Sequence, residues 1–237
     1  SAYLSSNENE GQEQVFGGQL IAQSLRAASL TQKDSKRIAS LHLSFLSRAE
    51  LQAPLKFRVD VIRDGSSFTR SHVYASQNDD LRATALITFN QSSHGLEHQA
   101  TMPVVPGPQE CADLAAVEQI YRKYYPNDLG VAANSTALPV QSVDMRFVDP
   151  DSLLQPEGES TNQMVWVRFA QVLEPDLELH KVILGYMSDQ SIAHIALQPH
   201  ALGAYNPKLR FLSIDHSISF HRPMRADDWL LLVRCCE

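Results

Sequence analysis

Two segments of this chain resemble each other when the sequence is shifted by 174 residues. The shift lays residues 41–59 over residues 215–233. Identical residues in the two copies are His42 and His216, Arg48 and Arg222, and Val59 and Val233. The order of predicted elements also repeats, with a helix, a loop, a strand, a polar turn and a further strand in each copy. A duplication of this kind predicts two similar α+β halves.

The first copy is predicted to begin with a helix that a sheet then covers. Apolar residues recur at helical spacing from Phe16 to Ala28, which predicts a helix over residues 18–29. The strands expected after it are residues 41–46, 55–61, 68–75 and 81–90. In the strand 55–61 the residues that alternate onto one face are Leu55, Phe57, Val59 and Val61. Asp64-Gly65 is typical of a hairpin turn.

The second copy follows a segment rich in proline at residues 101–110. We therefore place an N-terminal unit at residues 1–105 and a C-terminal unit, with its linker, at residues 106–237. Its predicted elements are a helix at 109–124, strands at 140–148 and 163–172, a helical run at 181–196, and strands at 211–220 and 229–235. About thirty residues of strand follow Val59 in the first copy, so we expect the C-terminal unit to be truncated at its end.

Composition excludes several classes of protein. The formal net charge of −7 argues against a nucleic-acid partner, which would need a basic surface. No apolar run approaches the roughly 20 residues of a membrane-spanning helix. Three cysteines, two of them adjacent, predict no disulfide framework and indicate an intracellular, reducing compartment. The spacings of zinc sites, phosphate loops and G-x-S-x-G nucleophiles are absent, so we expect neither a metal nor a cofactor.

Several short pieces of sequence carry a resemblance to a known family. V-F-G-G-Q-L-I-A-Q-S-L, S-L-H-L-S-F-L and R-D-G-S-S-F come first. They are followed by L-E-H-Q at 96–99, T-M-P at 101–103, Y-M-S-D at 186–189, A-L-Q-P-H at 196–200 and S-I-D-H-S-I-S-F-H-R-P at 213–223. In this order they resemble the acyl-CoA thioesterase II family of bacteria and peroxisomes. The resemblance implies a double hotdog fold, in which two tandem units each wrap an antiparallel sheet around a central helix.

The resemblance also implies an activity and its residues. The family hydrolyses fatty acyl-CoA to free fatty acid and CoA, a reaction of lipid metabolism. It implies acyl-CoA as substrate and CoA as product, a homo-oligomer (dimer or tetramer), and a cytoplasmic location in a bacterium or a peroxisomal one in a eukaryote. The attacking water is held by an Asp, a Ser or Thr, and a Gln. The Asp matches Asp189, the hydroxyl residue matches Ser213, and the Gln is expected beyond Glu237.

These residue types suit the hydrolysis of a thioester. A carboxylate such as Asp189 can accept a proton from water, and a hydroxyl can orient that water. The sequence places Asp189 where a helix begins, so an N-cap role is the alternative. Gly18 and Gln19, at the start of the first helix, can offer backbone N–H groups to an oxyanion or can simply allow tight packing. His42 either lines the substrate site or forms hydrogen bonds inside its unit.

Two other functions stay open at this point. The pair Asp189 and His194 has the spacing found in hotdog enoyl-CoA hydratases, although the run D-Q-S-I-A-H lacks their Asn-Pro. The second alternative is an acyl-CoA-binding protein that has no turnover.

Overall fold

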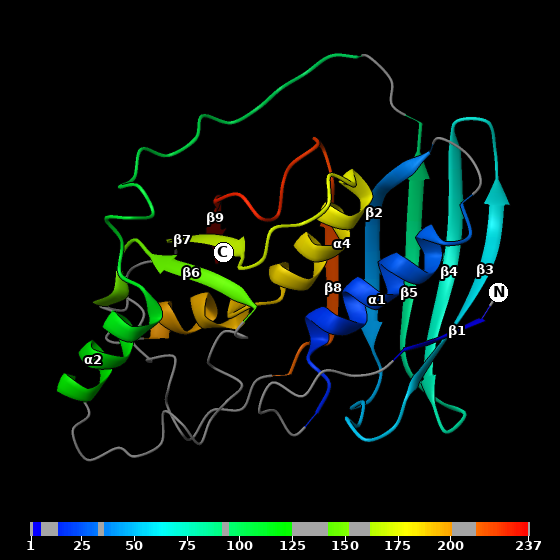
Figure 1. Cartoon of the computed structure of the whole chain (residues 1–237), viewed down its shortest axis with the longest axis horizontal. Helices are drawn as coiled ribbons and strands as arrows, with labels where there is room; N and C mark the ends of the chain where they lie inside the picture. The colour runs from blue at the N-terminus through cyan, green and yellow to red at the C-terminus, as the bar shows by residue number, and fades with distance from the viewer. Residues whose placement is uncertain are drawn as a thin grey trace. The chain divides into compact units, whose positions relative to one another are not determined.

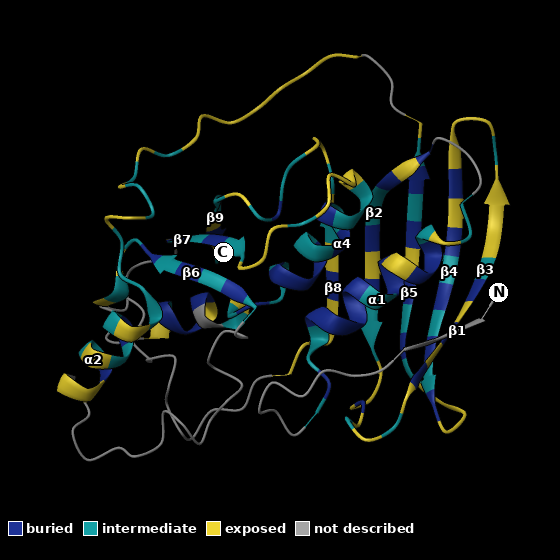
Figure 2. Cartoon of the chain, in the orientation of Figure 1, coloured by how far each residue is buried: buried dark blue, intermediate teal, exposed yellow. Residues whose placement is uncertain are grey.

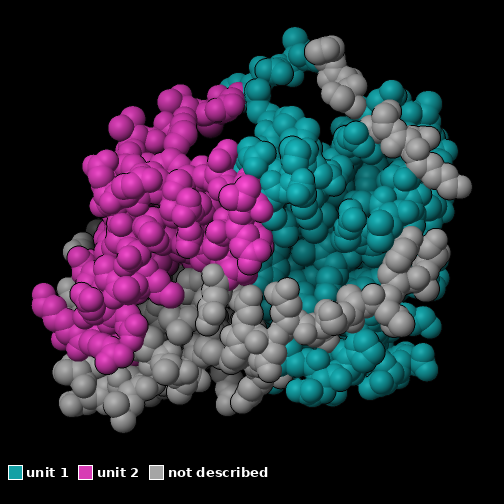
Figure 3. Space-filling model, in the orientation of Figure 1, with its two compact units in different colours: residues 1–98, 173–189, 212–226 teal, residues 99–172, 190–211, 227–237 magenta. Residues whose placement is uncertain are grey.

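The computed structural model describes residues 2–5, 14–32, 36–91, 95–124, 142–151, 162–200 and 212–236. The chain divides into two compact units, which Figure 3 shows in different colours. Unit 1 contains residues 1–98, 173–189 and 212–226, and unit 2 contains residues 99–172, 190–211 and 227–237. Each unit combines an antiparallel sheet with helices. The boundary that the repeat suggests after residue 105 stays a prediction.

Unit 1 is built on a sheet of six antiparallel strands in the order β1-β3-β4-β5-β2-β8. The strands are β1 (Ala2–Ser5), β2 (Arg37–Phe45), β3 (Leu55–Asp64), β4 (Phe68–Gln77), β5 (Asp80–Asn90) and β8 (Asp215–Ser219). Strands β2 and β8 come from the two copies of the sequence repeat. They pair directly, with Leu43 opposite His216 and His42 opposite Ser217. Antiparallel pairing of equivalent strands is the arrangement expected about a twofold axis between two copies.

The core of unit 1 lies between this sheet and helix α1 (Gly17–Ser29) (Figure 1). The helix is buried over most of its surface, including Leu20, Ile21 and Leu25 (Figure 2). Alternating side chains of the sheet are buried against the helix, among them Leu41 and Phe57. The burial of Leu20, Ile21 and Leu25 follows the helical spacing of apolar residues that the sequence shows. The predicted helix and the four predicted strands of the first copy all form, with small differences at their ends.

Burial of alternate residues in β3 ends at Val59, two residues before the end of the predicted alternation. Leu55, Phe57 and Val59 are buried, but the side chain of Val61 is 48% exposed. The pairing of β3 with β4 shifts register between Val61 and Arg63, so the strand leaves the core at this point. Val61 keeps the predicted alternation, opposite Ser71, but it is the last residue before the register shift and is not covered by the core.

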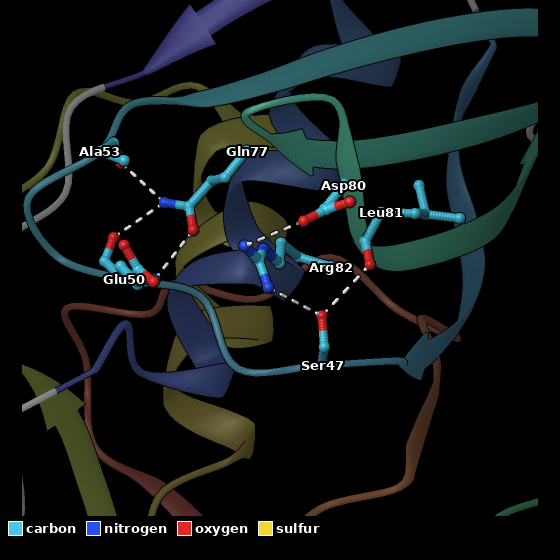
Figure 4. Close-up of polar contacts among 7 residues, drawn as sticks. All are labelled: Ser47, Glu50, Ala53, Gln77, Asp80, Leu81 and Arg82. Carbon is cyan, nitrogen blue, oxygen red and sulfur yellow. Dashed lines mark hydrogen bonds and ion pairs between the residues drawn. The ribbon is translucent and has the colours of Figure 1, made fainter.

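The loop between β2 and β3 is held by Gln77, the last residue of β4 (Figure 4). The buried Gln77 amide donates to Glu50 O (2.8 Å) and Ala53 O (2.6 Å) and accepts from Glu50 N–H (2.8 Å). The same loop bridges back to the residues before α1, since Val15 N–H donates to Ala49 O (2.9 Å). These contacts fix the point at which α1 begins.

Helix α4 (Leu177–Ser188) packs along α1 in unit 1. Its N-cap, Asp176, accepts a hydrogen bond from Glu178 N–H (2.9 Å). The first turn of α4 is attached to β2, because Glu178 accepts from Ile38 N–H (2.8 Å) and Lys181 donates to Ile38 O (2.7 Å).

Unit 2 contains a sheet of three antiparallel strands in the order β6-β7-β9. Its elements are α2 (Leu114–Tyr124), β6 (Val143–Phe147), β7 (Asn162–Phe169), the 3₁₀ helix η2 (Ile192–His200) and β9 (Leu230–Cys235). Val143, Met145, Val165 and Val167 form the buried face. The guanidinium of Arg234 on β9 donates to Gln190 O (2.6 Å) and Gln163 Oε1 (2.9 Å).

Two predicted helices differ from those in the structure. The helix expected at 109–124 begins at Leu114, because Asp113 accepts Ala116 N–H (2.8 Å) and caps it there. The helical run expected at 181–196 is two helices, α4 and η2, separated by a turn at residues 189–191. Ser191 in this turn has a positive φ of 50°, which an α-helix cannot contain. No helix among the described residues is long and apolar enough to cross a membrane.

Candidate active site

Helix α1 begins without a cap of its own. Its N-cap residue, Phe16, has no side-chain oxygen, and no side-chain cap is present there. The N–H of Gln19 reaches back to Phe16 O (3.0 Å), which leaves the N–H groups of Gly17 and Gly18 to find acceptors elsewhere. A helix start of this kind favours a negative charge.

Asp189 supplies that charge from the end of α4. The Gly18 N–H donates a hydrogen bond to the Asp189 carboxylate. A Cβ added to Gly17 would lie 2.5 Å from Asp189 Oδ2, so the carboxylate sits directly on the first turn of α1. Asp189 is the C-cap of α4, with φ −87° and ψ −4°. The expectation that Asp189 begins a helix was therefore wrong. It ends one helix and caps another.

Close packing of α1 against α4 brings these groups together. A Cβ on Gly18 would overlap the backbone oxygen of Tyr186 and the ring of Phe16. A Cβ on Gly185 would lie 2.7 Å from Leu25 Cδ1. The Phe16 and Tyr186 rings meet edge to face, with centroids 5.4 Å apart. The glycines are thus needed at the helix crossing, which is the packing role considered for Gly18 from the sequence.

His216 on β8 is the second titratable residue beside Asp189. Its Nδ1 lies 3.7 Å from Asp189 Oδ1, and its Nε2 lies 2.9 Å from Ser188 Oγ. Both side chains are buried, Asp189 being 7% exposed and His216 9% exposed. The repeat marks His216 only as the equivalent of His42. The sequence offers one signal of burial, the alternation of His216 with Ile218.

Burial shifts the pKa of each group in the direction that favours its neutral form. It raises the pKa of Asp189 to about 7, against the opposing effect of the Gly18 N–H. It lowers the pKa of His216, while the negative charge of Asp215 acts in the opposite direction. A carboxylate with a pKa near neutrality can both hold and release a proton at physiological pH.

The two proposed oxyanion donors already have acceptors in this structure. Gly18 N–H bonds Asp189, and Gln19 N–H bonds Phe16 O. Among the described residues, Gly17 N–H makes no hydrogen bond to another backbone group, although the sequence did not single it out. The side chain of Gln19 is buried. A role for Gly18 or Gln19 toward the oxyanion stays a prediction.

The remaining predicted residues are not joined to Asp189. Ser213 is exposed and lies two residues before β8, and no hydrogen bond among the described residues links it to Asp189. His42 is exposed on the face of β2 that points away from α1, with Nδ1 2.6 Å from Ser217 Oγ. The side chain of His194, the residue of the hydratase alternative, lies outside the described part of the chain.

Comparisons with known proteins cover both copies of the repeat. The acyl-CoA thioesterase N-terminal domain model matches residues 5–90, and the acyl-CoA thioesterase model matches residues 140–234. Human acyl-coenzyme A thioesterase 8 is 32% identical over 228 residues, which cover 92% of this chain and 69% of the human protein.

Solved structures give the same result for the fold. An acyl-CoA thioesterase II from Mycobacterium marinum is 30% identical, with a TM-score of 0.75 over 98% of this chain and 79% of its own. A hot dog fold protein from Alicyclobacillus acidocaldarius, 17% identical, has a TM-score of 0.72 over 98% of this chain and 80% of its own. The α+β double hotdog expected from the sequence is confirmed. The chain therefore belongs to the acyl-CoA thioesterase family.

Proposed function

We propose that this protein hydrolyses fatty acyl-CoA thioesters to free fatty acid and CoA, with Asp189 as the base that activates water. The observation that carries the proposal is the buried Asp189 carboxylate on the first turn of α1, with a pKa raised to about 7 by burial. A base of this strength is matched to proton transfer near neutral pH. The start of α1 also favours negative charge, which is what a thioester carbonyl develops under attack.

The reaction follows from these two features. Water attacks the thioester carbonyl carbon while Asp189 takes a proton from it. The carbonyl oxygen becomes an oxyanion, for which the Gly17 N–H at the helix start is the candidate donor. The tetrahedral intermediate then expels the CoA thiolate, which takes up the proton from Asp189. Water and thioester thus become carboxylic acid and thiol, and Asp189 is again ionised.

The proposal is tested by measuring CoA release by the full-length protein. A thiol-reactive dye is used with saturated acyl-CoA substrates of several chain lengths. We expect catalytic release of thiol, with kcat/KM rising about tenfold per pH unit toward a plateau above the Asp189 pKa of about 7. Activity rises with pH because the ionised carboxylate is the active form. Binding without release would indicate an acyl-CoA carrier. Loss of enoyl-CoA absorbance without thiol would indicate a hydratase.

Ser213 is proposed to orient the water with Asp189, together with a Gln that the family resemblance places beyond Glu237. Ser213→Ala should lower kcat by roughly tenfold to a hundredfold, since a misoriented water reacts slowly. Ser213→Thr keeps the hydroxyl and should retain most of the activity. Mass spectrometry of a quenched reaction supplies the further check. An acyl group covalently attached to Ser213 would replace direct hydrolysis by a nucleophilic mechanism.

The oligomeric state, location and partners of the protein are proposed from the same resemblance to the family. We expect a dimer or tetramer, cytoplasmic in a bacterium and peroxisomal in a eukaryote, and no partner beyond substrate and product. Light scattering of the purified full-length protein measures the assembly, and a monomer would contradict it.

A further inference from the structure

His216 is a buried titratable residue that the hydrolysis described above does not use. It extends from β8 between Ser188 at the end of α4 and the Asp189 carboxylate. Opposite it on β2 lies the buried Leu43, its partner in the register. A buried histidine whose two ring nitrogens face two polar groups has a defined protonation, which the hydrogen bonds around it determine.

The hydroxyl of Ser188 fixes the proton on one ring nitrogen. Helix α4 ends when the Asp189 N–H turns to Met187 O, instead of reaching Gly185 O as in a continuing helix. The Ser188 hydroxyl donates to Gly185 O (2.9 Å) in its place. Because a hydroxyl has only one proton, Ser188 must accept from His216, and Nε2 must carry hydrogen (2.9 Å).

The other ring nitrogen then faces the carboxylate. In the neutral ring, Nδ1 is an acceptor, and it lies 3.7 Å from Asp189 Oδ1, which is also an acceptor when ionised. Two buried acceptors that face each other are unfavourable unless a proton lies between them. A single proton shared by the two groups removes this repulsion. On Nδ1 it makes a buried ion pair of zero net charge, and on Asp189 it makes the neutral acid that burial favours.

We propose that Asp189 and His216 hold one proton between them, and that His216 is a positioning residue which keeps Asp189 ionised for the attack of water. This inference rests on the proposed function. The imidazolium stabilises the carboxylate in a site where burial alone favours the neutral acid. His216 does not touch the reacting atoms and acts through Asp189.

The other charged groups near this pair do not replace His216. Helix α1 contributes its N-terminus, through Gly17 and Gly18. Asp215 on β8 is exposed, and its charge favours the imidazolium. The other charged or basic residues of α4 lie in its first half and bond Ile38 or Ala226; they are Glu178, His180 and Lys181. Tyr186, in the second half of α4, packs its ring edge to face on Phe16.

The test is the pH profile of kcat/KM for His216→Asn in the full-length protein, after subtraction of the uncatalysed rate. Without the imidazolium, the midpoint of the acid limb should move up by about one pH unit, which is about a tenfold loss at pH 6. Activity at pH 9 should stay within about threefold of wild type, and KM should be unchanged. A merely structural role for His216 would instead lower activity equally at every pH.

Two further variants make the result specific. Ser188→Ala frees the ring to rotate and should shift the midpoint in the same direction by a smaller amount. His72→Asn removes a histidine from the opposite face of the same sheet, where it bonds Tyr74 (3.0 Å), and should leave the profile unchanged. An unshifted or lowered midpoint in His216→Asn overturns this inference.

The variants distinguish failure of the proposed base, Asp189, from failure of the proposed shared proton. If Asp189→Asn stays active, the proposed base is wrong and the role of His216 falls with it. If Asp189→Asn is inactive while His216→Asn keeps the wild-type midpoint, only the shared proton is wrong. Circular dichroism and thermal melts of every variant identify loss of fold, and a shifted His216→Asn midpoint in a folded sample supports the proposal.

Discussion

Asp189→Asn is expected to lower kcat by about 10²–10⁴-fold, the usual contribution of a general base, and to make the folded protein more stable at neutral pH. Asparagine has the shape of aspartate and can still accept the Gly18 N–H, so α1 keeps its cap. It cannot take a proton from water. KM should change little, because the contacts made by the bound substrate remain.

The gain in stability follows from the direction of the pKa shift. Burial raises the pKa of Asp189 to about 7 in the folded state, above the value of about 3.9 in an unfolded chain. The folded protein therefore binds the proton more tightly, and this contribution to stability is lost as pH rises from 4 to 7. Asparagine never ionises and avoids that loss. The variant should be more stable than wild type by something on the order of 1–4 kcal/mol at pH 8, where Asp189 and His216 have lost the proton that they share.

Stability is measured by thermal melts of wild type and Asp189→Asn at pH 4 and pH 8, and kcat is measured from thiol release. The difference in Tm should be small at pH 4 and several degrees at pH 8. Asp80→Asn is the control, because that carboxylate is 79% exposed and lies at a hairpin end. Unchanged turnover would leave Asp189 only its capping role. A lower Tm at pH 8 would mean that the α1 N-terminus stabilises the carboxylate more than burial disfavours it.

The sequence predicts the first copy well because its pattern is local. The apolar residues of α1 recur at helical spacing, and strands such as β3 alternate over enough residues to define a face. The register shift between Val61 and Arg63 depends on the pairing of β3 with β4, which no local pattern contains. Resemblance to a family suggested the proposed role of Asp189, which the pattern alone could not distinguish from an N-cap.

The surroundings of Asp189 could not be predicted in this way. Between Ser188 and Ser191 no glycine or proline marks the end of α4, and the helical pattern runs on. His216 lies 27 residues beyond Asp189 and reaches it only through the pairing of β8 with β2. Such a contact depends on strand register and helix packing together, so a chemical pair can be invisible in a sequence that contains both residues.

Gly18→Ala is expected to destabilise the protein and to reduce its activity, even though alanine is the better helix former. In an exposed helix the substitution would stabilise by about 1 kcal/mol. Here the new Cβ overlaps the carbonyl oxygen of Tyr186, which belongs to the backbone and cannot rotate away. Overpacking of this kind costs about 1–3 kcal/mol and outweighs the gain in propensity.

The loss of activity has a separate cause. To admit the methyl group, α1 must move away from the end of α4, and the Gly18 N–H then separates from the Asp189 carboxylate. The N–H bond is what opposes the effect of burial, so its loss should raise the pKa of Asp189 further. The midpoint of the kcat/KM profile should therefore move to higher pH, and a shift of about one pH unit would lower activity at pH 7 about fivefold.

Melting curves and pH profiles of kcat/KM are recorded for Gly18→Ala and for the control Gly95→Ala. The comparison separates the overpacking and the change in the Asp189 pKa from a general effect of replacing glycine by alanine. Gly95 has no atom within 4 Å of an added Cβ, so its variant should match wild type in both measurements. A Gly18→Ala protein that melts higher than wild type would show that the Tyr186 carbonyl can retreat without cost. A lower Tm with an unshifted profile would show that the two helices separate without disturbing Asp189. A lower Tm together with a higher midpoint is expected, because the same crossing of α1 and α4 both packs the unit and sets the strength of its base.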